Sequence, residues 1–172
     1  MEQFAKLGLS KDVLSILKEA GFKTPSEIQE KTIPLALAGR DIIGGSATGS
    51  GKTLAFASPI IENLIPGQSI QSLILTPTRE LAEQVATSIR HFSRNKRLNI
   101  SAIYGGVDIQ RQIRDLRRTD VVVGTPGRIL DHLERRTLNL SRVKCLVLDE
   151  ADRMLDMGFI KDVELIIRKC PT

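Results

Sequence analysis

The chain has 172 residues and a formal net charge of +5, with 41% hydrophobic and 26% charged residues. This length predicts one domain that buries roughly two thirds of its unfolded surface. The chain lacks an apolar run of the ~18 residues that a membrane span needs and a signal peptide at its start, so we expect a cytoplasmic protein.

Composition also limits the possible ligands. Aromatic residues make up 3% of the chain, with no Trp and one Tyr, which argues against a stacking platform for nucleic-acid bases. The positive charge alone is weak evidence for an anionic partner. Cys145 and Cys170 form no CxxC pair, and no histidine is spaced to complete a zinc site, so we expect a buried apolar side chain and an incidental thiol.

Short apolar runs alternate with helical patterns along the chain. Each run is nearly continuous, as expected for parallel strands covered on both faces. The predicted strands are residues 41–44, 72–75, 100–104, 120–123 and 144–148. The predicted helices are residues 10–20, 26–38, 52–64, 79–94, 109–117, 127–135 and 160–169. The alternation predicts an α/β fold, a doubly wound and mostly parallel sheet with ligand sites at the carboxyl ends of the strands.

A glycine-rich segment, Ser46-Ala-Thr-Gly-Ser-Gly-Lys-Thr53, follows the first predicted strand and leads into a helix. Small residues let successive backbone N–H groups face phosphate oxygens. Lys52 would reach the β- and γ-phosphates of a nucleotide, and the Thr53 hydroxyl would bind Mg²⁺. Ser46 stands where the usual phosphate-loop pattern has glycine. The alternative is a glycine-rich turn before an ordinary helix.

Carboxylates stand where the last predicted strand ends, in the run Asp149-Glu150-Ala151-Asp152. Asp149 is placed to bind Mg²⁺, and Glu150 to orient or deprotonate an attacking water. The alternative is an acidic helix N-terminus with a favourable dipole. Because the run comes about 100 residues after a phosphate loop, the two motifs together predict hydrolysis of a Mg²⁺-bound nucleoside triphosphate.

Residues 4–159, which contain the phosphate loop and this acidic run, resemble the N-terminal RecA-like domain of DEAD-box ATP-dependent RNA helicases. Residues 1–172 would form that ATP-binding domain, with a Q-motif region at residues 1–30. Residues 21–29 are similar to the Q motif, whose glutamine reads adenine and whose aromatic stacks on it. An amide donor and acceptor match the N6/N7 edge of adenine. From the residues alone, Phe4 and Phe22 are better explained as core residues. The implied nucleotide-binding residues are Phe4, Phe22, Thr24, Gln29, Ala47, Thr48, Gly49, Ser50, Gly51, Lys52 and Thr53.

The resemblance also implies contacts to the sugar-phosphate backbone of RNA. Three segments match the family's motifs Ia, GG and Ib, and each follows a predicted strand. Helix N-termini offer free N–H groups to phosphate, and arginine adds bidentate charge. The implied RNA-binding residues are Pro77, Thr78, Arg79, Gly105, Gly106, Thr125, Pro126, Gly127 and Arg128. Singly, each segment could be a capped helix start with a surface arginine. In residues 109–118, Ile109, Ile113 and Leu116 form an apolar stripe predicted to face the core, and the arginines form a solvated basic back. Residues 90–97 show a similar pattern.

The resemblance implies further parts beyond Thr172: a strand ending in Ser-Ala-Thr, which Asp152 contacts, and a second lobe with an arginine finger. The missing strand is expected to leave a gap within the sheet, closed up or patched by a neighbour. With both lobes, the implied function couples ATP hydrolysis to local RNA unwinding, and this chain alone is expected to have little activity. One alternative is a non-catalytic fragment that binds RNA or a partner. Another is a DNA translocase, against which the Q motif and the acidic run argue.

Overall fold

The computed structural model describes all residues, 1–172, as two compact units. The first unit consists of Met1–Leu64 and Ser88–Arg97, and the second of Ile65–Thr87 and Leu98–Thr172. The helices are α1 (Glu2–Lys6), α2 (Lys11–Glu19), α3 (Glu27–Leu37), α4 (Lys52–Asn63), α5 (Arg79–Phe92), α6 (Ile109–Leu116), α7 (Pro126–Glu134), α8 (Ala151–Asp156) and α9 (Ile160–Ile167). The strands are β1 (Ser72–Leu75), β2 (Ile100–Ile103), β3 (Val121–Gly124) and β4 (Cys145–Leu148).

The first unit is helical, and its helices begin and end where the local sequence predicts. The Ser10 hydroxyl accepts a hydrogen bond from the N–H of Val13 and so caps α2. Gly21 and Gly39 follow α2 and α3 with φ values of +82° and +78°, a conformation that glycine adopts without strain. Helices α3 and α4 pack against each other.

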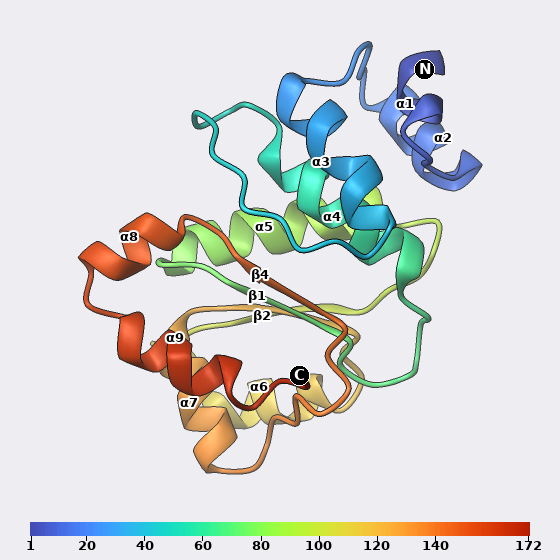
Figure 1. Cartoon of the computed structure of the whole chain (residues 1–172). Coiled ribbons are helices and arrows are strands. Elements are labelled where there is room, and N and C mark those ends of the chain that lie inside the picture. Colours follow the sequence, from blue (N-terminus) through green and yellow to red (C-terminus); the bar gives the residue numbers. More distant parts are fainter. The chain divides into compact units, whose positions relative to one another are not determined.

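The second unit is built on a four-stranded sheet in the order β2-β3-β1-β4, with every pairing parallel. All four residues of β1 and of β3 are buried, because these inner strands are covered on both faces. Helices α6, α7 and α9 lie together on one face of the sheet (Figure 1). The apolar core on that face includes Leu73, Leu75, Val122, Ile129 and Ile166. The predicted parallel α/β architecture is confirmed.

Residues 41–44 do not form the predicted strand. They run as an exposed irregular segment, and the side chain of Ile43 is fully exposed. The prediction was wrong because a strand needs a neighbour to complete its backbone hydrogen bonds, and no strand of this chain runs beside these residues. Residues 41–44 take no part in the four-stranded sheet, and β4 is an edge strand.

Smaller differences concern the ends of elements. Strand β2 ends at Ile103, α7 begins one residue earlier than predicted, at Pro126, and α9 ends at Ile167. Two short helices, α1 and α8, were not predicted because five or six residues are too few to show a helical period.

Candidate functional site

The predicted phosphate loop, residues 46–53, leads into α4, includes the first two residues of that helix, and is half-buried or exposed throughout. Gly49 and Gly51 have φ values of +79° and +89°, so the loop curls through a conformation that glycine favours. The hydroxyls of Ser46 and Ser50 lie 2.6 Å apart and are hydrogen-bonded. Lys52 is the first residue of α4, where unpaired backbone N–H groups and the helix dipole favour an anion.

The predicted adenine-reading residue, Gln29, contacts this loop. Its side chain is only 2% exposed. Its Oε1 atom accepts from the N–H of Ser26 at 2.9 Å, and its Nε2 atom donates to the carbonyl of Gly51 at 3.1 Å. A Cβ atom on Gly51 would lie 2.3 Å from that Nε2 atom, so this position requires glycine. One amide hydrogen and one lone pair of Gln29 remain for a ligand.

The two predicted aromatic residues form part of a cluster. Phe4 is fully buried, and its ring packs edge-on against Phe22 with centroids 6.1 Å apart. Phe22 packs in the same way against Phe92 at 6.0 Å and is half-buried. Thr24 is exposed. Phe4 is therefore a core residue that supports Phe22, and of the two rings Phe22 has exposed surface for a ligand.

The acidic run follows β4 at the carboxyl edge of the sheet. The N–H of Asp149 donates to the carbonyl of Leu75 and extends the pairing with β1 by one residue. Glu150 adopts left-handed backbone angles, φ 52° and ψ 51°, at the start of α8. For a non-glycine residue this costs of order 1–3 kcal/mol. Its carboxylate lies 3.3 Å from Arg153, whereas Asp152 is exposed and makes no ion pair.

The loop after β1 carries the predicted residues Pro77, Thr78 and Arg79. Pro77 is buried, and the Thr78 hydroxyl accepts from the N–H of Leu81 and caps α5. Arg79 is exposed, and its guanidinium lies over the ring of Tyr104, 5.7 Å from the centroid. This contact joins the loop after β1 to the loop after β2.

The loop after β2 contains Gly105 and Gly106, both exposed. Gly106 has a φ of +81°, and a Cβ atom there would lie 3.0 Å from the guanidinium of Arg79. The Tyr104 hydroxyl donates to the carboxylate of Glu83, and this bond raises the pKa of the tyrosine.

The loop after β3 opens α7. Thr125 is half-buried, Pro126 is buried at the first helical position, and Gly127 is exposed. Arg128 donates from Nη1 to the carbonyl of Val107 and to Oε1 of Gln112, both at 3.0 Å. Its side chain is 16% exposed, so much of the guanidinium is already committed within the protein.

Comparison with known proteins decides the family. The family model described as DEAD/DEAH box helicase matches residues 26–172. The chain belongs to the DEAD/DEAH box helicase family. It is 52% identical over 169 residues to the RNA helicase CrhR of Synechocystis, covering 98% of this chain and 34% of that protein.

Solved structures of DEAD-box proteins match the fold. A DEAD box protein from the hyperthermophile Methanococcus jannaschii is 52% identical, with a TM-score of 0.96 over 98% of this chain and 47% of the other. A hypothetical ATP-dependent RNA helicase from Sulfolobus tokodaii is 41% identical, with a TM-score of 0.87 over 94% of this chain and 47% of the other. This chain therefore covers only the first lobe of such helicases.

Two polar residues of this DEAD-box domain were not predicted as site residues. Gln112 and His132 are 4% and 0% exposed and hydrogen-bond to each other. Gln112 lies three residues after Ile109 and four before Leu116, on the stripe predicted to face the core. A polar residue on an apolar stripe was the signal that could have identified it.

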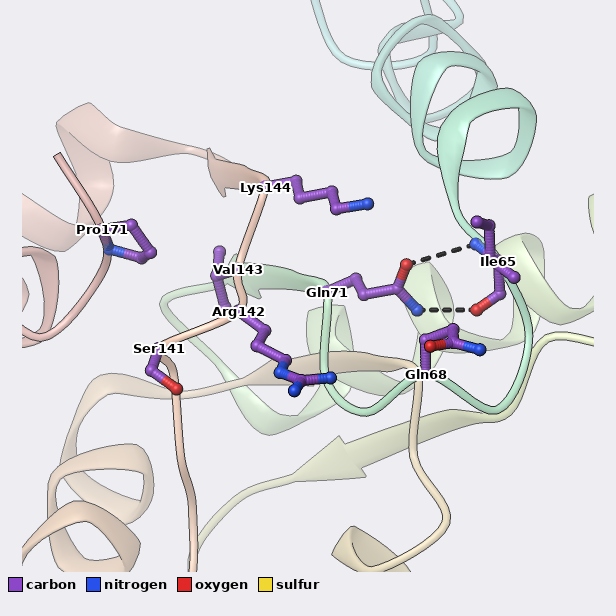
Figure 2. Close-up of a pocket in the computed structure, with 8 residues that line it drawn as sticks. All are labelled: Ile65, Gln68, Gln71, Ser141, Arg142, Val143, Lys144 and Pro171. Atoms are coloured by element: carbon purple, nitrogen blue, oxygen red, sulfur yellow. Dashed lines mark hydrogen bonds between the residues drawn. The ribbon is translucent and has the colours of Figure 1, made fainter.

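A cavity of about 390 Å³ lies at the opposite, amino-terminal ends of β1 and β4 (Figure 2). Gln71 lines it and bonds through its side-chain amide to both backbone groups of Ile65. Arg142 and Lys144 also line it. None of the predicted DEAD-box site residues does, and in open α/β sheets ligands bind at the carboxyl ends of the strands. The motif loops, and not this cavity, are therefore the candidate site.

The side chains and the helices also bear on metals and membranes. No group of three or more His, Cys, Asp or Glu side chains is arranged to hold a metal ion. Burial raises the pKa of the Cys145 thiol. None of the helices has both the length and the apolar character that crossing a bilayer requires.

Proposed function

We propose that this chain is the ATP- and RNA-backbone-binding lobe of an RNA helicase, and that it couples ATP hydrolysis to local RNA unwinding together with a second lobe. One observation supports this more than any other: the four motif-bearing loops leave the same edge of an in-register parallel sheet. The N–H of Asp149 continues β4 onto Leu75, the N–H of Thr125 continues β3 onto Ile103, and Thr76 continues β1. Four consecutive loops therefore stand side by side at one edge.

The proposed RNA contacts use the backbone of the nucleic acid and carry no base code. Arg79 is exposed and supplies charge, and the N–H groups of Gly105, Gly106 and Gly127 are on exposed residues. Thr78 and Pro126 are held inside their loops and would act by shaping them.

The proposed nucleotide contacts lie in the first unit. Residues 47–51 would present backbone N–H groups to the phosphates, and Lys52 would neutralise the β- and γ-phosphate charge. Gln29 keeps one amide hydrogen and one lone pair for the adenine edge. Its bond to Gly51 means that the residue proposed to read the base also holds the loop proposed to bind the phosphates.

Glu150 is the proposed base: its carboxylate would accept the proton of the attacking water. Thr53 and Asp149 offer a hydroxyl and a carboxylate oxygen, the donors that Mg²⁺ prefers, and Mg²⁺ usually takes only one or two protein carboxylates. A Mg²⁺ ion held by such donors would neutralise phosphate charge as it develops. Without an arginine from the second lobe, turnover by this chain alone should be lower by a factor of about 10³–10⁵.

The test joins this chain to a second helicase lobe and measures ATP turnover with and without single-stranded RNA. We expect turnover to rise with RNA and to disappear in Lys52→Ala and Glu150→Gln. The matched controls are Lys161→Ala and Glu164→Gln, which change exposed residues of α9. Turnover that persists in Lys52→Ala or Glu150→Gln would contradict these roles. RNA binding without any turnover would favour a non-catalytic RNA-binding fragment.

A further inference from the structure

The buried residue Gln112 forms hydrogen bonds through both the nitrogen and the oxygen of its side-chain amide within the second unit. Its Nε2 atom donates to the carbonyl of Tyr104 at 2.9 Å. Its Oε1 atom accepts from Nη1 of Arg128 at 3.0 Å and lies 2.9 Å from Nε2 of His132. The same helix also has an exposed face, where a polar side chain would be solvated. A buried amide with this many hydrogen-bond partners therefore indicates a role in holding those partners in place.

These contacts fix the protonation of His132. Arginine can only donate, so the Gln112 atom that faces Arg128 must be the oxygen. That oxygen also faces Nε2 of His132, which must therefore carry a hydrogen. Nδ1 then accepts from the hydroxyl of Thr137, 2.7 Å away, which is a shorter contact than the 3.2 Å between that hydroxyl and the carbonyl of His132. Burial, followed by the charge of Arg128, lowers the pKa of His132, so the neutral imidazole with a hydrogen on Nε2 is favoured.

The same contacts hold both ends of the Gly105-Gly106 loop. The carbonyl before the two glycines, that of Tyr104, is bound by Gln112. The carbonyl after them, that of Val107, is bound by Arg128. Both carbonyls are thus occupied, while the two glycines between them stay exposed.

We propose that Gln112 and His132 are positioning residues for RNA: together they fix the Gly105-Gly106 loop and the guanidinium of Arg128 in one arrangement before RNA arrives. This rests on the proposed function, because it requires that these loops contact RNA. Arg128 keeps the donors on Nη2 beyond those used by Gln112 and Val107, whereas its Nε atom faces a carboxylate oxygen of Asp131 at 3.9 Å. Gln112 orients that guanidinium, and His132 orients the Gln112 amide. A backbone site held in this way loses less conformational freedom on binding.

The first experiment needs no RNA and uses ¹⁵N-labelled 172-residue chain. Long-range ¹H–¹⁵N spectra should show His132 with a hydrogen on Nε2 and a bare Nδ1, assigned with a His91→Gln variant. In Gln112→Leu, this single tautomer should be lost, and the amide signals of Gly105 and Gly106 should shift or broaden. Gln110→Leu changes an exposed residue of the same helix and should leave both unchanged. A hydrogen on Nδ1 in the wild type, or unchanged glycine amides in Gln112→Leu, would overturn the proposal.

The second experiment measures affinity for a single-stranded RNA oligonucleotide. Gln112→Leu should weaken it about tenfold, the effect of roughly one well-placed interaction. Gln112→Glu keeps an oxygen for Arg128 and His132 but cannot donate to the carbonyl of Tyr104, so this variant should bind RNA with intermediate affinity. The glutamate variant also keeps the test decidable if the leucine variant fails to fold. RNA affinity of both Gln112 variants equal to that of wild type would refute the positioning role. If the wild type itself does not bind RNA, the proposed function fails instead.

Discussion

Replacing Gly51 by alanine tests whether Gln29 and the phosphate loop are energetically coupled. The new Cβ atom would lie 2.3 Å from Nε2 of Gln29, so that side chain must move and lose its bond to the Gly51 carbonyl. Alanine at a φ of +89° adds about 1–2 kcal/mol of backbone strain. The lost hydrogen bond adds about 0.5–1.5 kcal/mol. We expect Gly51→Ala to lower the free energy of unfolding by about 2–3 kcal/mol.

The matched control is Gly39→Ala in the same unit. Gly39 has a φ of +78°, but a Cβ atom there would meet nothing within 4 Å. It should therefore cost only the strain, about 1–2 kcal/mol. Urea unfolding followed by circular dichroism measures both variants, and Gln29→Ala is combined with each. Most of the extra cost of Gly51→Ala should disappear in the Gln29→Ala background, which leaves only the 3.0 Å approach of the Cβ atom to the Ser26 hydroxyl. Equal costs for the two glycine variants, or an extra cost of undiminished size without Gln29, would refute the coupling.

Three further predictions concern the second unit, each measured by urea or thermal unfolding. Asp120 is 1% exposed and accepts hydrogen bonds from the N–H groups of Gly67 and Asn99, both at 2.8 Å. Asparagine has one oxygen and can accept only one of them, so Asp120→Asn should lower the free energy of unfolding by about 1–3 kcal/mol. No loss of stability would disprove these bonds. In Gly124→Ala the Cβ atom would lie 2.6 Å from a carbonyl oxygen of β2. We therefore expect the free energy of unfolding to fall by about 1–3 kcal/mol. Wild-type stability of this variant would count against the close approach. Burial lowers the pKa of His132 below its ordinary 6.5, so the unfolded chain binds more protons and the free energy of unfolding should fall as pH drops below about 6.5. A His132→Gln variant should lose that part of the pH dependence. An unchanged pH dependence in this variant would show that another group causes it.

Much of the fold was predictable because most of its strands can be recognised from the local sequence alone. Residues 72–75 were predicted as a strand to the residue, since four consecutive buried positions leave a continuous apolar run. Residues 41–44 carry a similar run, Ile42-Ile43, but whether it becomes a strand depends on a neighbour far along the chain. Local sequence cannot show that such a partner is present.

The candidate site divides in the same way. The motif residues could be proposed from the sequence because each loop needs particular residue types at a fixed spacing. The sequence could not show which atoms of Arg128 are already hydrogen-bonded, because the partners Val107 and Gln112 come from other segments. Gln112 lies on the predicted core-facing stripe of residues 109–118, but its partners Tyr104, Arg128 and His132 come from other segments, so the sequence could not show its role.

The strand order also has a consequence for synthesis of the chain. The central strand β1 pairs on one side with β3 and on the other with β4, and the bond from Ser72 to Cys145 spans 73 residues. A chain that emerges from the ribosome in sequence order must therefore carry this buried apolar strand without its neighbours until most of the second unit has been made. Such non-local parallel pairing slows folding and leaves an apolar edge open to aggregation meanwhile. During translation, β1 is the segment of this domain that most needs shielding by a chaperone.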